Sequence, residues 1–564
     1  KYLKKGNDMV KQNKYILFFL IFIFFNSHLN SQKIDIIVSG ESNTGTTILN
    51  NETFKINLNE NDLKSFKHRG FISYGDMGAA GDGKSDDINF IISTHHIANK
   101  YGLAVRANQG AKYFIGGKDN SAIIKTNTDF LNSTFIIDDT DVENREVSIF
   151  SVESNLNPIS IHGINRIKKN QDKINFNSKT SCLITVSDSN IRNYIRYGLN
   201  QNNGKPQTDI FIVDKNGKID KSSPIIWDFK NITEIRATPI DAKQLVINGG
   251  KFITIANKAP SNYTYYSRNI SITRSNVIVK NLEHIIIGEG DNGAPYRGFL
   301  SISDCSNITV KDCILTGHKT YRTIGNAGKP VSMGSYDLSV RRAINVNVIN
   351  CKQTNDINDH TYWGIFASNY SKNITFNNCI FSRFDAHMGV YDATIRNSTL
   401  GHMGINAIGS GTLLIENTKV YGRSLVNFRQ DYGSTWEGEL IIKNCVFAPI
   451  NHAIDEDNKS NINYLPIFTG KNSGKHNFGY TCYMPKNIII ENLFFDDSNF
   501  NEEKNALVVF SNFNPEMKSD NYSETFPYIK TKKIILNNVT TSSGKELLVS
   551  ENPFMFKEIK IERN

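Results

Sequence analysis

ITFNNC, residues 374–379, is one of nine short segments that share a single pattern of residue types. Each segment begins with β-branched or other apolar residues, carries an Asn or Asp next to its end, and closes on a small or apolar residue. The other eight are VIVKNL (277–282), ITVKDC (308–313), VNVINC (346–351), ATIRNS (393–398), LLIENT (413–418), LIIKNC (440–445), IIIENL (488–493) and IILNNV (534–539). Such composition predicts short strands that end in tight turns.

The spacing of these segments indicates a repeat. Asn350, Asn378, Asn397, Asn417 and Asn444 follow one another at intervals of 28, 19, 20 and 27 residues. Repeats of this length, with several short strands and little helix signal, are typical of a solenoid of β-coils. Because one coil cannot bury its own apolar face, the coils must stack, with parallel strands about 4.8 Å apart. The sequence therefore predicts an all-β solenoid.

The residues that close the segments predict two ladders along this solenoid. Each Asn is expected in a turn, where its side chain hydrogen-bonds the backbone of the neighbouring coil. The next residue is expected to point inward, and Ser398 and Thr418 occupy this position in coils where no disulfide partner exists. We therefore predict free, buried thiols at four equivalent positions, Cys313, Cys351, Cys379 and Cys445.

A different unit precedes the coils, at SYGDMGAAGDGKSDDINFIISTHHIANKYG (73–102). A glycine-rich turn leads to Ser85 and Asp86, which are good N-cap residues, and an apolar-periodic stretch from about Asp87 to Lys100 predicts a helix. We assign Asp82, Asp86 and Asp87 a structural role in this turn. The glycine spacing differs from that of a phosphate-binding loop.

This unit closely resembles the N-terminal capping segment of the pectate lyase superfamily, in which a Gly-Asp-Gly-x-x-Asp-Asp turn precedes a helix that closes the solenoid. The resemblance implies a right-handed parallel β-helix with an N-terminal helical cap, and the coil pattern extends it over roughly residues 66–545. The expected organisation is a single domain, 33–564, with a cap at 66–120 and regular coils at about 240–545. The resemblance also implies a polysaccharide lyase that cleaves a glycosaminoglycan-like or pectin-like polymer.

The first 32 residues read as upstream residues and a signal peptide. Met9 is the expected start, Lys11 and Lys14 follow, and the apolar run Tyr15–Phe25 is too short to span a bilayer comfortably. A polar stretch with a cleavage zone near Ser31 comes next. We expect a secreted, periplasmic or cell-surface protein without a membrane span, and a monomer.

The charge of the chain is mildly basic. The formal net charge is +9, and the five Lys and one Asp of residues 1–32 leave +5 for the remainder. This excess suits an acidic polysaccharide as the partner. The chain shows no nucleotide-binding loop, zinc-ligand spacing or nucleophile elbow, and we expect no nucleic-acid partner.

Chemically capable residues are densest in four segments, 355–364, 383–389, 401–404 and 427–438. Trp363, His402 and Arg429 each lie the same number of residues before the terminal Asn of their coil, so they are expected at equivalent positions. Asp385 and Tyr432 share a second such position. The predicted catalytic residues are Arg383, Asp385, His387, His402, Arg429 and Tyr432. The predicted substrate-binding residues are His360, Tyr362, Trp363 and Trp436, with His318 and Arg322 from a second patch at 288–298 and 317–330.

This inventory suits β-elimination from a uronic acid. His387 or His402 can remove the proton α to the carboxylate. Arg429 or Arg383 can neutralise that carboxylate. Tyr432 or Tyr362 can protonate the leaving oxygen. The sequence therefore predicts a lyase that cleaves a uronate-containing polysaccharide, either glycosaminoglycan-like or pectin-like.

Two alternatives remain open. Asn355-Asp356, Asp385 and the Gly-His-Met-Gly at 401–404 are similar, in order, to motifs of galacturonase-like hydrolases of the same fold, but the Asp-Asp pair and the Arg-x-Lys of that family are missing. Asp356, Asp359 and Asp385 would be the carboxylates of such an enzyme. A non-catalytic carbohydrate-binding β-helix is the other alternative.

A metal site is a further question for these segments. The residues that suggest one are Asp356, Asp359, His360, Asp385 and His387. Ca²⁺ prefers shells made of oxygen atoms alone, and the histidines weaken that signal. We therefore predict that no cofactor is required, with Ca²⁺ as the ion to test.

Overall fold

The computed structural model of the chain describes residues 34–35, 44–49, 52–260, 265–290, 294–450, 463–471, 474–500, 505–526 and 528–563. The predicted signal peptide, residues 1–32, lies outside these described residues. Among the described residues, no helix combines the length and the hydrophobicity that a membrane crossing requires. The chain divides into two compact units, Lys1–Glu60 and Asn61–Asn564.

The first unit contains a small antiparallel sheet. Its strands follow the order β1-β2-β3, with bounds β1 (Ile34–Asp35), β2 (Thr44–Leu49) and β3 (Glu52–Asn57). β2 pairs with β3 along its whole length, from Thr44 opposite Asn57 to Leu49 opposite Glu52. Helix α1 (Glu60–Arg69) begins at the boundary between the two units.

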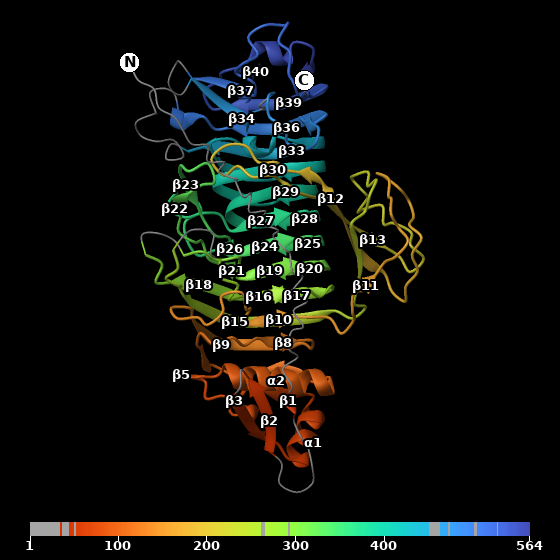
Figure 1. Ribbon diagram of the computed structural model, residues 1–564. Helices are drawn as coiled ribbons and strands as arrows, with labels where there is room; N and C mark the ends of the chain where they lie inside the picture. Colours follow the sequence, from red (N-terminus) through yellow and green to blue (C-terminus); the bar gives the residue numbers. More distant parts are fainter. Residues whose placement is uncertain are drawn as a thin grey trace, which may run out of the picture. The chain divides into compact units, whose positions relative to one another are not determined.

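The second unit begins with the predicted cap. Helix α2 (Ile88–Tyr101) ends at Gly102, whose positive φ of 68° and N–H bond to the Ala98 carbonyl close the last turn. The Asp87 carboxylate accepts from the backbone N–H groups of Ala80 (2.7 Å) and Gly81 (3.1 Å), so it fixes the preceding turn. The helical cap is confirmed, one residue later at each end than predicted, and Figure 1 shows α2 beside the first coils.

Three ladders of parallel strands make up the body of this unit (Figure 1). Ladders A and B share the strands β9 (Thr128–Asp138), β15 (Leu245–Ile255), β33 (Trp436–Pro449), β36 (Asn487–Phe495) and β39 (Lys533–Thr541). The long strands β29 (Ile380–Arg396) and β30 (Thr399–Glu416) run through all three ladders, A, B and C.

The remaining strands belong to one ladder each. Ladder A adds β4 (Phe71–Ser73), β6 (Ala104–Arg106), β17 (Val277–Lys280), β20 (Ser306–Lys311), β25 (Ile344–Ile349), β28 (Lys372–Asn377) and β41 (Lys560–Arg563). Ladder B adds β5 (Asp82–Asp86), β7 (Lys112–Ile115), β18 (Glu283–Ile287), β21 (Ile314–Leu315), β26 (Lys352–Gln353) and β31 (Lys419–Gly422). Ladder C comprises β8 (Ala122–Ile124), β10 (Phe150–Val152), β16 (Ile270–Ile272), β19 (Leu300–Ser303), β24 (Leu338–Arg341), β27 (Phe366–Asn369), β32 (Val426–Phe428), β34 (Tyr464–Gly470), β37 (Ala506–Phe510) and β40 (Leu547–Ser550).

Alternation of side chains along each strand explains the stacking. In β25 and β28 the buried residues Val346 and Val348 pair with Ile374 and Phe376, while the residues between them face outward. Burying such a side chain stabilises the fold by about 1.5–3 kcal/mol. The chain is a right-handed parallel β-helix with an N-terminal helical cap, which confirms the predicted fold class.

The turn between ladders A and B contains the predicted Asn ladder. Asn350, Asn378 and Asn397 adopt positive φ values of 52–56°, as the turn requires. The Asn378 side-chain amide donates to Asn350 Oδ1 at 2.8 Å, and Asn350 donates to Asp312 Oδ1 at 3.1 Å. The prediction was wrong in one detail: these amides bond each other, because the backbone carbonyl of the next coil already accepts the backbone N–H, as from Asn378 to Arg396.

The thiol ladder has the predicted form. Cys313, Cys351, Cys379 and Cys445 are at most 2 % exposed, and all seven cysteines are free. Ser398 occupies the same position and donates its hydroxyl to the Arg396 carbonyl at 2.7 Å, as a thiol does in neighbouring coils. A thiol or hydroxyl group at these positions can reach a backbone oxygen two residues earlier, whereas Leu493, which pairs with Cys445, fills the same position with an apolar side chain.

A second sheet, called here the side sheet, interrupts the coils between residues 153 and 240. It is antiparallel, in the order β11-β14-β12-β13, with bounds β11 (Ile159–Ser160), β12 (Cys182–Asn193), β13 (Lys205–Val213) and β14 (Glu234–Pro239). Figure 1 shows it beside the coils. A buried ion pair between Lys372 on β28 and Asp209 on β13, with a nitrogen–oxygen distance of 2.8 Å, joins it to the solenoid.

Short elements complete the described chain. The hairpin β22 (Tyr321–Ile324) and β23 (Pro330–Met333) leaves the coils between ladders B and C, and β35 (Cys482–Tyr483) pairs with β38 (Tyr528–Ile529). The 3-10 turns are η1 (Gly75–Met77), η2 (Gln430–Tyr432), η5 (Ser498–Phe500) and η6 (Pro553–Phe556). η2 follows β32 directly and positions part of the candidate site.

Candidate functional site

Three predicted catalytic residues face outward together from one strand of ladder C. Arg383, Asp385 and His387 alternate along β29 with Phe384 and Ala386, which are fully buried in the core. Side chains of a strand point to opposite faces in turn, so burial of the second set places the first set on the outer face. The outer face of β29 is therefore the base of the candidate site.

Asp385 lies at the centre of this site. Its carboxylate is fully buried and pairs with Arg383 Nη2 at 2.8 Å and Arg429 Nη1 at 3.1 Å. Tyr336 donates its hydroxyl to Asp385 Oδ2 at 2.8 Å. Burial alone would raise the pKa of Asp385, but the two guanidinium groups outweigh it and hold that pKa below its ordinary value.

Arg429 extends the network to the surface. It donates to both carboxylate oxygens of Asp431 in η2, at 3.2 and 2.9 Å. Arg196, from the segment after β12 of the side sheet, pairs with the same Asp431 at 2.7 Å. Burial raises the pKa of Asp431, yet Arg429 and Arg196 hold it well below its ordinary range. The side chains of Arg196, Arg429 and Asp431 are 12–20 % exposed.

We call these five residues, Arg196, Arg383, Arg429, Asp385 and Asp431, the arginine cluster. Three guanidinium groups face two ionised carboxylates, so the cluster carries one excess positive charge. A guanidinium has five N–H donors, and the bonds of Arg196 to Asp431 involve two of its nitrogens, Nε and Nη2. The surface edge of the cluster can therefore accept a further carboxylate.

His387 borders the cluster in its neutral form. Its Nδ1 lies 2.8 Å from Asn369 Oδ1, which can accept but not donate, so the hydrogen is on Nδ1 and the lone pair on Nε2. Burial and the charge of Arg429 lower the pKa of His387 to about 3. The imidazole is a hydrogen-bond acceptor at neutral pH.

Tyr432 packs edge-on against His387, with ring centroids 5.4 Å apart. The guanidinium carbons of Arg196 and Arg429 lie 5.3 and 5.4 Å from the centroid of its ring. Burial raises the pKa of Tyr432, although the two arginines lower it. The phenol therefore keeps its proton at neutral pH, next to an imidazole that has none on Nε2.

Other predicted residues lie apart from this group. His402 Nε2 contacts the Tyr362 carbonyl at 3.2 Å, so it faces the 354–362 loop. His360 is exposed on that loop, and Tyr362 is half-buried. Arg322 is exposed on the β22 hairpin. The structure does not bring these four residues into the arginine cluster.

Both tryptophans predicted to stack on sugars are otherwise engaged. Trp436 is fully buried and donates its indole N–H to the Gly411 carbonyl at 3.0 Å, so it belongs to the core. The ring of Trp363 lies 5.2 Å from the guanidinium of Arg383, and Gly334 packs directly against its indole. The prediction was wrong for Trp436, and Trp363 supports Arg383.

The predicted register was also wrong. Asp385 pairs with Asn406, and Asn406 pairs with Asn427, so Asn427 and not Tyr432 is the equivalent of Asp385. Arg429 follows Asn427 by two residues, so it does not stand at the position that is equivalent to His402, which precedes Asn406. Counting from the terminal Asn fails because η2 and its flanking turn lengthen this coil between ladder C and ladder A.

The carboxylates suggested for hydrolysis or Ca²⁺ do not gather. Asp356 is exposed, and Asp359 accepts from Thr361 within its own loop, whereas Asp385 is paired with arginines. Among the described residues, no group of three or more His, Cys, Asp or Glu side chains could hold a metal ion. His387 faces Asn369, so the proposed ligand set is not assembled.

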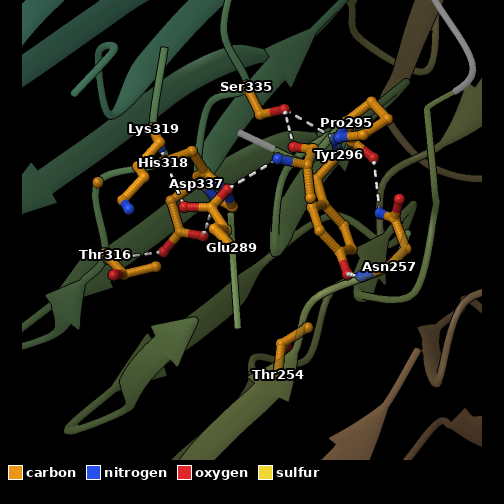
Figure 2. Close-up of polar contacts among 12 residues, drawn as sticks. Thr254, Asn257, Glu289, Pro295, Tyr296, Thr316, His318, Lys319, Ser335 and Asp337 are labelled. Carbon is orange, nitrogen blue, oxygen red and sulfur yellow. Dashed lines mark hydrogen bonds and ion pairs between the residues drawn. The ribbon is translucent and has the colours of Figure 1, made fainter. Parts of the chain in front are cut away.

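His318, predicted to bind substrate, lies in a buried network instead (Figure 2). It is 1 % exposed, with Nε2 3.1 Å from Asp337 Oδ1 and Nδ1 3.6 Å from Glu289 Oε1. Asp337 also pairs with His284 at 2.8 Å and accepts from the Thr316 N–H at 2.9 Å. The prediction was wrong because these coils use the histidine to satisfy two buried carboxylates.

This network predicts a pH-dependent stability. Burial alone would lower the pKa of His318, but the hydrogen bond to Asp337 and the nearby carboxylate of Glu289 raise it to about 9. A histidine whose pKa is raised in the folded state stabilises the fold. This contribution is fully present below the pKa of the unfolded chain, about 6.5, and is lost as the pH rises through about 9. The free energy of unfolding should therefore fall by about 3 kcal/mol across this window.

Denaturant titrations of the native protein and of His318→Gln at several pH values test this. The variant should be less stable at neutral pH and should lose the decline between about pH 6.5 and 9. His162→Gln, which changes an exposed histidine, is the control and should retain it. An identical decline in His318→Gln would contradict the assignment.

Sequence reasoning missed three members of the site. Asp431 stands within a segment that the sequence singled out, but its role depends on η2. Tyr336 precedes β24 and carries no local signal. Arg196 reaches Asp431 across 235 positions of sequence from an insertion that lacks the coil repeat. Nothing in the repeat pattern could have indicated that contact.

Comparison with known proteins gives structural matches alone. No family model matches the chain, and no curated protein matches it. The tailspike gp61 of Pseudomonas phage phi297 is 13 % identical, with 87 % of this chain and 84 % of that chain covered and a TM-score of 0.52. The tailspike gp49 of Pseudomonas phage LKA1 is 13 % identical, with 83 % and 81 % covered and a TM-score of 0.47.

A third structure is the Gp54 tailspike of Acinetobacter baumannii bacteriophage AP22, solved in complex with A. baumannii capsular saccharide. It is 11 % identical, with 85 % of this chain and 77 % of that chain covered and a TM-score of 0.47. At identities this low, similarity concerns architecture. The chain therefore shares the parallel β-helix fold of the phi297 tailspike.

Proposed function

We propose that the chain is an exported enzyme that cleaves a uronate-containing polysaccharide by β-elimination at the outer face of β29. One observation carries the proposal: an excess guanidinium charge at the surface edge of the arginine cluster lies beside a neutral imidazole and a protonated phenol. A β-elimination needs these three functions within reach of one sugar residue.

The excess charge would bind the substrate carboxylate. Arg196 and Arg429 are held by Asp431 and by the ring of Tyr432, so their orientation is fixed before substrate arrives. Preorganised donors stabilise charge that develops in a transition state better than mobile ones. In β-elimination this charge develops on the uronate carboxylate once the α-proton leaves.

The proton transfers can be assigned to His387 and Tyr432. His387 Nε2 would remove the C5 proton, a double bond would form between C4 and C5, and the bond from C4 to the glycosidic oxygen would break. The Tyr432 hydroxyl would protonate the departing oxygen. The lowered pKa of His387 and the raised pKa of Tyr432 leave both groups in the protonation states that this sequence requires.

Hydrolysis fits the same residues less well. A glycoside hydrolase needs one carboxyl group kept protonated beside a second that is ionised. Arginines lower the pKa of both Asp385 and Asp431, so both are ionised near neutral pH. The cluster therefore offers no carboxylic acid as proton donor, which favours the lyase over the hydrolase.

The proposal is tested with a panel of purified uronate polysaccharides, in assays with and without a calcium chelator. We expect shortened chains with an unsaturated, ultraviolet-absorbing end, and no dependence on Ca²⁺. New reducing ends without that chromophore would make the protein a hydrolase. Binding without chain shortening would make it a non-catalytic carbohydrate-binding β-helix.

A further inference from the structure

A shallow cleft lies where the side sheet meets the coils, next to the arginine cluster. Tyr194 and Trp227 come from the inserted segment, and the other side comes from β29, β30, β33 and the chain near β35. The lining residues are Tyr194, Ile226, Trp227, Gly389, Gly409, Ser410, Thr435, Glu437, Tyr480, Thr481 and Tyr483. We call this the seam cleft; the reaction proposed above does not use it.

The seam cleft combines aromatic rings with hydroxyl groups. The ring of Trp227 is half-buried and lies 6.2 Å from that of Tyr480, at an interplanar angle of 62°. Tyr480 is fixed from below, since its hydroxyl donates to the Tyr432 carbonyl. Aromatic faces pack against the apolar C–H surface of a pyranose, and hydroxyl side chains match its hydroxyl groups. The composition suits a sugar ring.

Its charge differs from that of the arginine cluster. The described lining residues include one carboxylate, Glu437, and neither Lys nor Arg. Lys169, outside the lining, neutralises that carboxylate at 2.8 Å, and both side chains are about 40 % exposed. A uronate placed here would meet no uncommitted cation, so it would lose part of its hydration without compensation. A sugar residue without a carboxylate would avoid this cost.

The two sites are adjacent. Gly389, in the lining of the cleft, stands two residues after His387 on β29. A Cβ atom at Gly389 would lie 2.7 Å from the Tyr194 hydroxyl, so the glycine lets Tyr194 approach the strand closely. The ring of Tyr194 contacts both Tyr432 and Tyr480, with centroids 6.2 and 4.9 Å away.

We propose that the seam cleft binds a carboxylate-free sugar residue next to the uronate, so that the substrate is a heteropolysaccharide in which uronic acid alternates with neutral or amino sugars. This inference rests on the proposed function. It adds the class of polymer, because a polysaccharide made of uronate alone would place a second carboxylate in a cleft whose described lining offers no Lys or Arg.

Binding measurements with size-matched oligosaccharides test this inference. One probe alternates uronate with a hexosamine, and the other contains uronate alone. We expect the native protein to bind the alternating probe at least tenfold more tightly, measured by calorimetry. Ser410→Trp, which fills the cleft, should remove that preference without changing the affinity for the uronate-only probe.

Two further variants keep the test decisive. Trp227→Ala should also remove the preference. Because Trp227 packs against the core of the side sheet, this variant could lose stability as well. Glu437→Gln, which keeps the side-chain volume, is therefore included and should reduce the preference for the alternating probe. Ser189→Trp, at an exposed position of β12, is the matched control and should change neither affinity. Equal affinities of the native protein for both probes, or a Ser410→Trp variant that keeps the preference, would overturn the inference.

The failure of this inference can be told apart from failure of the proposed function. If uronate polymers are cleaved with the expected chromophore but the seam variants bind both probes normally, the elimination stands and the seam assignment fails. If no acidic polysaccharide is bound or cleaved, both fail together.

Discussion

Replacing His387 with alanine is expected to lower kcat/KM on the cleaved polysaccharide by about 10²–10⁴-fold, the usual contribution of a general base. Its Nδ1–H is bonded to Asn369, which leaves Nε2 as an acceptor, and its ring packs edge-on against that of Tyr432. Initial rates of chromophore formation measure the effect. Circular dichroism and the denaturation midpoint verify that the variant is folded.

A purely structural role for His387 makes different predictions. Added imidazole should restore part of the activity of His387→Ala if the ring transfers a proton, because a free base can occupy the vacated space. The native protein should keep its kcat/KM from neutral pH down to about pH 4, since the pKa of His387 is about 3. His96→Ala, on α2, is the control. A folded His387→Ala variant with activity within a few-fold of native would remove it from the reaction.

The sequence was sufficient for the fold because a solenoid turns local pattern into long-range packing. Asn378 and Asn397 occupy equivalent turn positions one coil apart, as Cys379 and Ser398 do, and each coil contacts the next along the chain. Their residue types therefore report the register without any distant partner. The side sheet has no such periodicity, and its contacts with the coils, such as Asp209 with Lys372, could not be read from it.

The candidate site was partly predictable for the same reason. Arg383, Asp385 and His387 were found because they stand close together in one dense segment of the sequence, and alternation along a single strand then places them on one face. Arg429 was assigned to the site through an incorrect register, since η2 changes the length of its coil. Arg196 was beyond reach, because its pairing with Asp431 depends on how an insertion folds back.

Residue type also misled where one side chain suits two environments. Trp436 was expected to stack on sugar, but its indole N–H is satisfied by the Gly411 carbonyl, so the residue can be fully buried. His318 was expected at the surface, but Asp337 and Glu289 make its charged form favourable in the interior. A single sequence does not distinguish a satisfied buried polar group from an exposed functional one.

Asp385→Asn is expected to lower the free energy of unfolding by about 3–5 kcal/mol, the usual cost of removing one partner of a buried ion pair. The carboxylate is fully buried and is paired with Arg383 and Arg429, whose side chains are 5 % and 12 % exposed. An asparagine leaves Arg383 in a poorly solvated place without its carboxylate partner, and removes one of the two carboxylates that hold Arg429. Guanidinium denaturation at neutral pH measures the loss.

Asp304→Asn provides a matched comparison, because Asp304 also binds two arginines, Arg342 and Arg236, but its side chain is 18 % exposed. Solvent can hydrate the arginines there, so we expect a smaller loss. The pH supplies a second test: the contribution of Asp385 is present above about pH 4 and is lost as the pH falls through its lowered pKa, so the deficit of Asp385→Asn should shrink in strong acid. Equal losses for the two variants would mean that burial of the arginine cluster adds nothing, and the fixed orientation required of Arg429 would lose its physical basis.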